Sequence, residues 1–389
     1  MSEKEINIII KRILFDIQKR EVEVDDIDVS DGILGISLFY LLYSKLYNNA
    51  EALDVSVNIV ARVISRLNSG YTSSKLWSEI IELGKYLIYL KNNNISIDGI
   101  DDTLEEIDQI LEDYLITLLK EENFDTAYGA ISVGYYFIAR LKIKPSKAKT
   151  LVLIFQSLKS SRKSTKNHIY WPSWIEETDN VQLGYMHGTS GILNFLTELA
   201  RCKVIIVDNL SLVNDVSLAL ISSKFSNIKN SNLYPKYLGS SNEYYARDIC
   251  YGDLGIGFAL YNSGEILKSK RILRESEIVL KHFIDNRQLN TSQINDASLL
   301  YGSSGLMSYF NLLSMRTLKS LYKNESMFWK NKTINYASHE NNYAGFDFYW
   351  NPEQIKTKYT YSNGISGVGC ALISERLKDF SFLQFLNYY

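Results

Sequence analysis

The chain has 389 residues, a net charge of −2, and 46% hydrophobic against 22% charged residues. This balance excludes a disordered chain, and it excludes a strongly basic surface for nucleic acid or acidic lipid. The three cysteines are few, odd in number and widely spaced, which does not suggest a disulfide framework and predicts a reducing compartment. Residues 1–5 lack the basic start and the uninterrupted apolar stretch that are typical of a signal peptide, and no apolar run reaches the roughly 18 residues of a membrane span. We therefore expect a soluble cytoplasmic protein that binds no nucleic acid and does not span a membrane.

Helical periodicity is the main structural signal along the chain. Apolar residues recur at helical spacing in residues 6–18, 50–67 and 104–119, and the whole chain holds only four prolines, which suits uninterrupted helices. No series of alternating strands is visible. Three connections, residues 167–182, 227–247 and 322–362, are long, polar and rich in aromatic residues. They are expected either to form the walls of a substrate groove or simply to cap the fold.

A short glycine motif recurs, each time before an apolar helical stretch. Its first glycine is residue 32, 129, 188, 252, 302 or 364, and the copy at 129 lacks the second glycine. The first gap, 97 residues against 50–64 for the others, is about two units long, so a seventh copy is expected at residues 76–83, with Glu79 and Glu82 in the glycine positions. Seven units of two helices each predict an all-α fold, an α/α toroid of about seven inner and seven outer helices. We expect residues 1–389 to form a single domain.

The glycines are expected at the starts of the inner helices, where small residues allow close backbone approach. Helix N-termini present N–H groups and positive dipole ends, which favour a thiolate or an enolate. The alternative is that the glycine pairs serve packing alone.

The repeats, with His187-Gly188-Thr189-Ser190-Gly191 in the fourth and a Cys-Tyr-Gly-Asp-Leu-Gly run beginning at Cys250 in the fifth, resemble the lanthionine synthetase C-like (LanC-like) family. The resemblance covers roughly residues 10–385. It implies an α/α toroid that closes thioether rings by adding a peptide cysteine thiol to dehydroalanine or dehydrobutyrine. It also implies a dehydrated precursor peptide as substrate and, as a further partner, a dehydratase or other modification enzyme.

The family's zinc site is incomplete in this sequence. Cys250 stands at one ligand position, but Leu300 and Tyr301 replace the Cys-His pair that opens the sixth repeat in the family. Leucine has no ligand atom, and a phenol is a poor zinc ligand beside imidazole or thiolate. The sequence therefore predicts no bound metal and no other cofactor. Cys250 is then either a relic or part of the site in another role.

Other family positions carry functional side chains. His187 matches the active-site histidine, and Asp125 matches the acidic residue before the third-repeat glycine. Arg247 and Tyr251 resemble the residues that flank the fifth-repeat cysteine, although Arg247 is one residue closer to it than usual. Each also has a structural alternative: an ordinary hydrogen-bonded histidine, a helix N-cap for Asp125, and an ion pair with Asp248 for Arg247.

The catalytic prediction assigns a role to each of these residues. His187 acts as the base, Asp125 holds its tautomer, and Arg247, Tyr251 and Tyr301 stabilise the enolate oxygen.

The functional prediction is a zinc-independent lanthipeptide cyclase that forms (methyl)lanthionine in the biosynthesis of a ribosomally made peptide. One alternative is a module that binds a peptide or an enzyme in such a pathway without catalysis. A further alternative is a carbohydrate-active enzyme on a similar barrel, for which Asp125 and Asp253 are the only carboxylates linked to the motifs.

Overall fold

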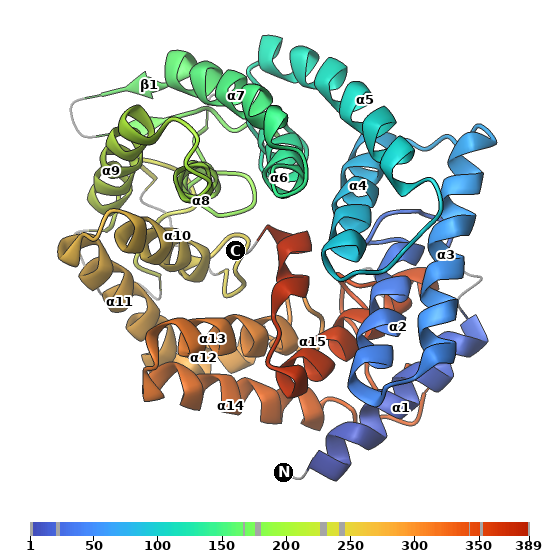
Figure 1. Ribbon diagram of the computed structural model, residues 1–389. Helices are drawn as coiled ribbons and strands as arrows, with labels where there is room; N and C mark the ends of the chain where they lie inside the picture. Colours follow the sequence, from blue (N-terminus) through green and yellow to red (C-terminus); the bar gives the residue numbers. More distant parts are fainter. Residues whose placement is uncertain are drawn as a thin grey trace. The chain divides into compact units, whose positions relative to one another are not determined.

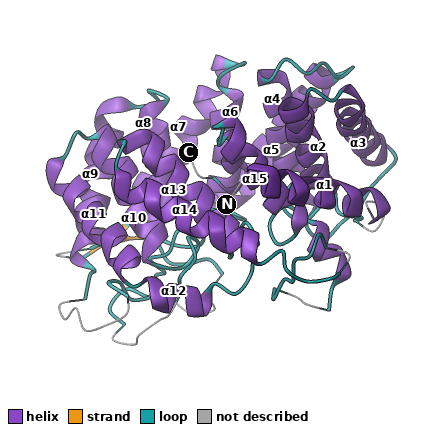
Figure 2. Cartoon of the chain, turned by 90° about the horizontal axis from the view of Figure 1, so that it is seen from below, coloured by secondary structure: helices purple, strands orange, loops and turns teal. Residues whose placement is uncertain are grey.

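The computed structural model describes residues 3–20, 24–165, 168–175, 180–225, 232–240, 246–341, 343–350 and 353–387. Within these ranges almost all regular structure is helical, and β1 (Lys163–Ser164) and β2 (Ile169–Tyr170) form one short antiparallel pair (Figure 2). The chain divides into two compact units, Met1–Ile100 with Ile294–Tyr389, and Asp101–Gln293. We call these unit 1 and unit 2.

Unit 1 contains α1 (Glu3–Arg20), α2 (Ile33–Tyr47), α3 (Ala50–Asn68), α4 (Leu76–Asn92), α13 (Ser303–Thr317), α14 (Ser320–Asn335) and α15 (Ile365–Leu377), with 3-10 helices η3 (Ile355–Tyr359) and η4 (Ser381–Leu386). Helix α5 (Ile100–Lys120) begins at the boundary. Unit 2 continues with α6 (Ala130–Arg140), η2 (Pro145–Lys147), α7 (Ala148–Ser161), α8 (Thr189–Arg201), α9 (Ile206–Ser222), α10 (Asp253–Ile266), α11 (Lys270–Asp285) and α12 (Arg287–Gln293). The helices predicted in residues 6–18, 50–67 and 104–119 are confirmed as α1, α3 and α5.

The helices pair into hairpins, and the two helices of a hairpin differ in how much of their surface is buried. One partner, such as α8, α10 or α15, is buried on nearly every side, whereas α3 and α11 bury only one stripe of residues. Within unit 2, α8 packs on α9 and α10 on α11, and the two buried helices α8 and α10 also pack together (Figure 1). Within unit 1, α2 packs on α3 and α13 on α14. Burial all round one helix and along one face of the next is what a two-layer arrangement produces.

The first glycine of every motif is the N-cap of a buried helix, in extended conformation: Gly32, Gly129, Gly188, Gly252, Gly302 and Gly364. The second glycine lies in the first helical turn, where an added Cβ would overlap the carbonyl oxygen six residues earlier. In three copies it also faces the loop of a neighbouring repeat: Gly35 meets Tyr361, Gly255 meets Tyr185, and Gly367 meets Leu299. The expected close backbone approach is therefore present, and much of it is to the motif's own loop.

The loops before these helices are joined by backbone hydrogen bonds at one repeated position, two residues before the first glycine. In unit 2, Met186 N–H donates to the Cys250 carbonyl at 3.0 Å. In unit 1, Leu300 N–H donates to Ser362, and Ser362 N–H donates to Ser30, each at 2.9 Å. Ser30 N–H in turn donates to Glu82 Oε2 at 2.7 Å. The Glu82 side chain therefore takes the place of a loop carbonyl in the second repeat.

Two details of the sequence interpretation need correction. The N-cap of α4 is Lys75, so Glu79 lies in the first turn of the helix and not at its N-cap, and Glu82 lies further inside. The connection expected at residues 322–362 begins only after Asn335, because α14 continues to that residue. Helix α14 buries Tyr322, Ser326, Trp329 and Thr333, a stripe at helical spacing that polar residues conceal in the sequence.

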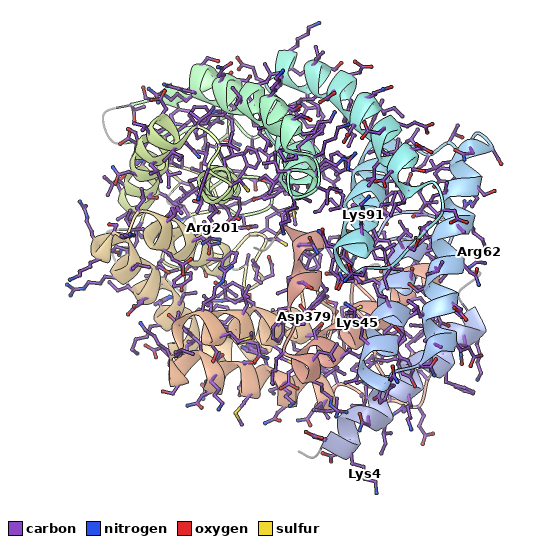
Figure 3. The ribbon with its side chains drawn as sticks, viewed as in Figure 1. Lys4, Lys45, Arg62, Lys91, Arg201 and Asp379 are labelled. Atoms are coloured by element: carbon purple, nitrogen blue, oxygen red, sulfur yellow. The ribbon has the colours of Figure 1, made fainter. Side chains whose placement is uncertain are left out.

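Basic residues lie in the last turn of most motif-bearing helices, where they complement the negative end of the helix dipole. Figure 3 labels three of them, Lys45 of α2, Lys91 of α4 and Arg201 of α8. The motif loops lie at the opposite, N-terminal ends of these helices.

Among the described helices, none is long and apolar enough to cross a membrane.

Candidate active site

Asp125 closes the loop that leads into α6. Its Oδ1 accepts hydrogen bonds from the backbone N–H groups of Ala127 and Tyr128, each at 2.8 Å. The residue four before the first glycine has the same role in other repeats, since Asp28 accepts from Asp31 N–H at 2.7 Å and Asp248 accepts from Tyr251 N–H at 2.9 Å. Asp125 is thus a loop cap shared between repeats, and not the N-cap of α6, which is Gly129.

The second oxygen of Asp125 has a partner that is particular to this repeat. Asp125 Oδ2 lies 2.8 Å from Nδ1 of His187, with the two side chains 0% and 8% exposed. A carboxylate at this distance holds the proton on Nδ1, which leaves Nε2 as the basic nitrogen of the neutral ring. Because the Oδ1 bonds fix the carboxylate to the backbone, the imidazole is oriented by a rigid group.

His187 lies directly before the first glycine of its motif, and so do two tyrosines of unit 2. The His187 ring stacks on Tyr128 with centroids 6.0 Å apart, and it lies 5.7 Å from the ring of Tyr251. Tyr128 is 57% exposed, so this group is reached from solvent. The residues before the first glycine in three repeats of unit 2 thus form one group, in which the His187 ring lies near the rings of Tyr128 and Tyr251.

Arg247 belongs to a buried group of charges at the start of α10. The side chain is 3% exposed, and its charge acts on Asp253 and on His282 of α11. Burial raises the pKa of Asp253 to about 6, against the opposing effects of backbone N–H groups of Leu233 and Tyr234 and of Arg247. Burial and the Arg247 charge lower the pKa of His282. Arg247 is therefore positioned to neutralise Asp253, and contact with an enolate stays a prediction.

The residues at the family's zinc positions do not form a suitable donor set. Cys250 is fully buried, and its backbone carbonyl accepts from Tyr185 and Met186 N–H groups. Leu300 and Tyr301 supply neither thiolate nor imidazole. Over the ranges that the structure describes, no three His, Cys, Asp or Glu side chains cluster in a way that could hold a metal ion. These residues do not fit zinc.

Tyr301 lies in unit 1, at the same motif position as His187. Its ring lies 4.9 Å from that of Trp350. The structure thus brings together His187, Asp125 and Tyr251 within unit 2, while Tyr301 is part of a separate aromatic contact. Their catalytic roles stay predictions.

Sequence reasoning missed Tyr128, although the signal was present. Tyr128, His187 and Tyr251 all precede the first glycine of their motifs, so the repeat alone placed them in equivalent loops.

Comparisons with known proteins agree with this arrangement. A family model described as "Lanthionine synthetase C-like protein" matches residues 23–384. The chain belongs to the lanthionine synthetase C-like family. A search of curated proteins finds no match to this chain.

Among solved structures, the chain is similar to one described as "Nisin cyclase", with a TM-score of 0.76 and 16% sequence identity over 97% of this chain and 95% of that chain. At this identity the likeness shows the fold. The all-α, α/α-toroid fold class expected from the repeats of this LanC-like chain is thereby confirmed.

Proposed function

We propose that this LanC-like protein is a lanthipeptide cyclase that works without zinc. The observation that carries the proposal is the buried hydrogen bond between Asp125 Oδ2 and His187 Nδ1, which orients a general base beside two tyrosine rings. Family membership supports the reaction class, and the unsuitable donor set at Cys250, Leu300 and Tyr301 supports a metal-free route. The substrate would be a dehydrated precursor peptide, supplied by a dehydratase in the same cytoplasmic pathway.

The base is needed because a free thiol ionises poorly near neutral pH. A cysteine with a pKa near 8.5 is only about 3% thiolate at pH 7, which corresponds to a cost of about 2 kcal/mol. His187 Nε2 takes the proton from the substrate thiol, and the sulfur then forms a bond to Cβ of the dehydroalanine. The C=C electron pair moves toward the carbonyl oxygen as an enolate. Protonation of Cα by the imidazolium restores neutral His187 and completes the thioether.

Tyrosine hydroxyls provide the donors for the developing enolate oxygen. Tyr251 lies beside His187, which places its phenol within the same loop cluster. Arg247 and Tyr301 are the further candidates taken from the family positions. Donors aimed at the charge that develops in the transition state are typically worth a few kcal/mol each.

The test uses a synthetic peptide that carries one dehydroalanine and one cysteine. Ring closure leaves the mass unchanged, so the reaction is followed by loss of the thiol that N-ethylmaleimide would label. Wild-type protein is expected to close the ring faster than buffer alone, and the His187→Asn variant, with its fold verified by circular dichroism, is expected to fall to the buffer rate. A folded wild-type protein that binds the peptide but leaves its thiol unreacted would support the non-catalytic module instead.

A further inference from the structure

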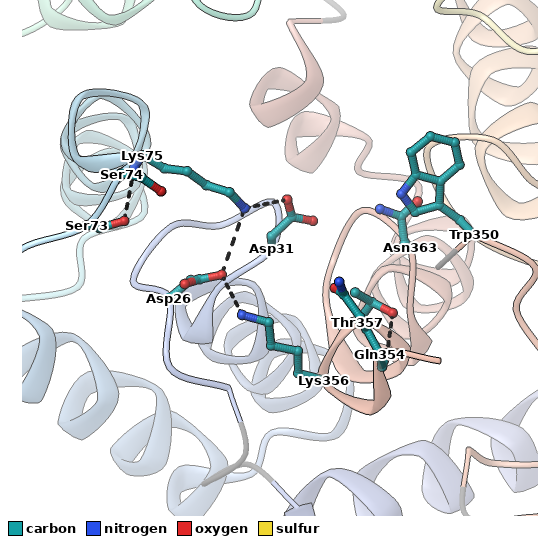
Figure 4. A pocket seen from close by; sticks show the side chains of 10 residues that line it. All are labelled: Asp26, Asp31, Ser73, Ser74, Lys75, Trp350, Gln354, Lys356, Thr357 and Asn363. Atoms are coloured by element: carbon teal, nitrogen blue, oxygen red, sulfur yellow. Dashed lines mark hydrogen bonds and ion pairs between the residues drawn. The ribbon is translucent and has the colours of Figure 1, made fainter. Parts of the chain in front are cut away.

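Unit 1 contains a cavity of about 350 Å³ that the proposed mechanism does not use. Its lining includes Asp26, Asp31, Lys75, Trp350, Lys356 and Asn363, which come from the loops before α2 and α15 and from the start of α4 (Figure 4). The volume lies at the small end of the range for ligand sites, enough for part of a peptide and too small for a large cofactor.

The cavity is built from the same repeat position as the candidate active site. Asp31 precedes Gly32 and Asn363 precedes Gly364, just as His187 precedes Gly188. Trp350 also contacts Tyr301, which holds this position before Gly302. Two of the motif loops of unit 1 therefore place the equivalent side chains, Asp31 and Asn363, in the lining of one cavity, and neither is a base of the histidine type.

Asn363 gives the most specific indication of which ligand the cavity binds. It is 5% exposed, and among the described residues its Oδ1 has no hydrogen-bond partner. Figure 4 draws its side chain among those that line the cavity. A buried acceptor without a donor is destabilising, so such groups in native proteins call for a partner. A ligand N–H would satisfy it.

The charges of the cavity cancel. Lys75 Nζ lies 3.5 Å from Asp31 and 3.9 Å from Asp26, and Lys356 Nζ lies 3.3 Å from Asp26. Two cations against two carboxylates give no net attraction for an anion or a cation. Trp350 is 50% exposed and offers an apolar surface on which a side chain can pack.

We infer that this cavity binds a backbone amide of the precursor peptide through Asn363, with the neighbouring peptide side chain packed on Trp350. A side-chain amide and a peptide group have matching donors and acceptors, which suits a neutral, polar and extended ligand. This inference rests on the proposed function, because it assigns the cavity to the peptide on which the cyclase acts. The cavity holds the substrate and takes no part in proton transfer.

The test measures binding apart from catalysis. The probe is the synthetic cyclisation peptide with its cysteine replaced by alanine and a fluorescein label, followed by fluorescence anisotropy. Trp350→Ala and Asn363→Leu are each expected to raise its Kd by about tenfold. Tyr349→Ala is the matched control, because Tyr349 is adjacent to Trp350 in the chain, is 66% exposed and does not line the cavity. The Kd of this variant for the peptide is expected to stay at the wild-type value.

The outcomes separate this inference from the proposed function. With the cysteine-containing peptide, Asn363→Leu should raise KM and leave kcat unchanged. Unchanged Kd and KM in Asn363→Leu, alongside normal ring closure, would overturn the cavity inference and leave the cyclase intact. Cavity-dependent binding by a wild-type protein that closes no ring would support the cavity and overturn the cyclase. If inorganic phosphate displaces the peptide, and Lys75→Ala abolishes that competition, the cavity is an anion site and the inference fails.

Discussion

The two oxygens of the Asp125 carboxylate have different partners. Oδ1 holds the loop backbone, whereas Oδ2 holds His187. An aspartate-to-asparagine change can therefore keep the first role and lose the second, since an amide oxygen still accepts N–H bonds while an amide nitrogen cannot accept from Nδ1.

We expect Asp125→Asn to lower the cyclisation rate by roughly 10²–10⁴-fold with little change in thermal stability, because the imidazole is held in the wrong tautomer. The rate is measured by thiol alkylation, and stability by circular dichroism. Asp248→Asn is the matched control, since Asp248 caps the equivalent loop through Tyr251 N–H and should retain activity. An equal rate loss in both variants would contradict an orienting role for Asp125.

Asp253 gives a prediction for the dependence of stability on pH. Its pKa of about 6 in the folded protein exceeds the ordinary value, so the folded state binds the proton more tightly than the unfolded state. Its contribution to the free energy of unfolding therefore increases as pH falls through 6 toward 4. Between pH 7 and pH 5 the gain is about 1 kcal/mol. Burial also raises the pKa of Asp248 to about 6, so Asp253→Asn should keep part of the gain. Urea unfolding at both values should show a gain about 1 kcal/mol smaller in Asp253→Asn than in wild type; an identical gain in both proteins would contradict a contribution from Asp253.

At the scale of the element, the glycines of the motif allow a loop to fold back against the first turn of the helix that follows it. Gly305 illustrates this, because a Cβ there would overlap the Leu299 carbonyl oxygen, a backbone atom that cannot swing aside. The same motif is also where neighbouring loops meet, so the cost of a misplaced helix start extends to the adjacent repeat.

We expect Gly305→Ala to reduce the free energy of unfolding by at least about 3 kcal/mol or to prevent folding. Gly99→Ala is the control, since Gly99 has a φ of +72° and open space around its Cβ position, and backbone strain alone should cost about 1 kcal/mol. Denaturant unfolding compares the two. Equal losses would mean that the close approach at Gly305 relaxes without cost.

At the scale of the whole molecule, the lack of a zinc donor set among the residues that the structure describes has a direct consequence. If catalysis relies on His187, the purified protein should hold far less than one zinc ion per chain, and prolonged treatment with a chelator should leave the cyclisation rate unchanged. Metal analysis by plasma mass spectrometry accompanies the rate measurement. Stoichiometric zinc whose removal stops the reaction would contradict the metal-free mechanism and show that an unrecognised ligand contributes.

Sequence alone determined the features that depend on local pattern. Helical periodicity placed α1, α3 and α5, and the glycine repeat placed the starts of six buried helices, because each motif encodes a short-range backbone constraint. The same repeat identified the family and marked His187 and Asp125. It also placed residues 1–389 in one domain, which stays a prediction.

Tertiary structure decided the features that depend on contacts between distant segments. His187 and Asp125 are 62 residues apart, and only folding brings their loops within a hydrogen bond. The mixed polar and aromatic stripe of α14 became a buried face only by packing on α13, so the long connection expected at residues 322–362 begins only after Asn335. Glu82 became a partner of the Ser30 backbone, and Asn363 a buried acceptor facing a cavity. In each case the chemistry of a side chain follows from its neighbours in space, and local sequence does not encode those neighbours.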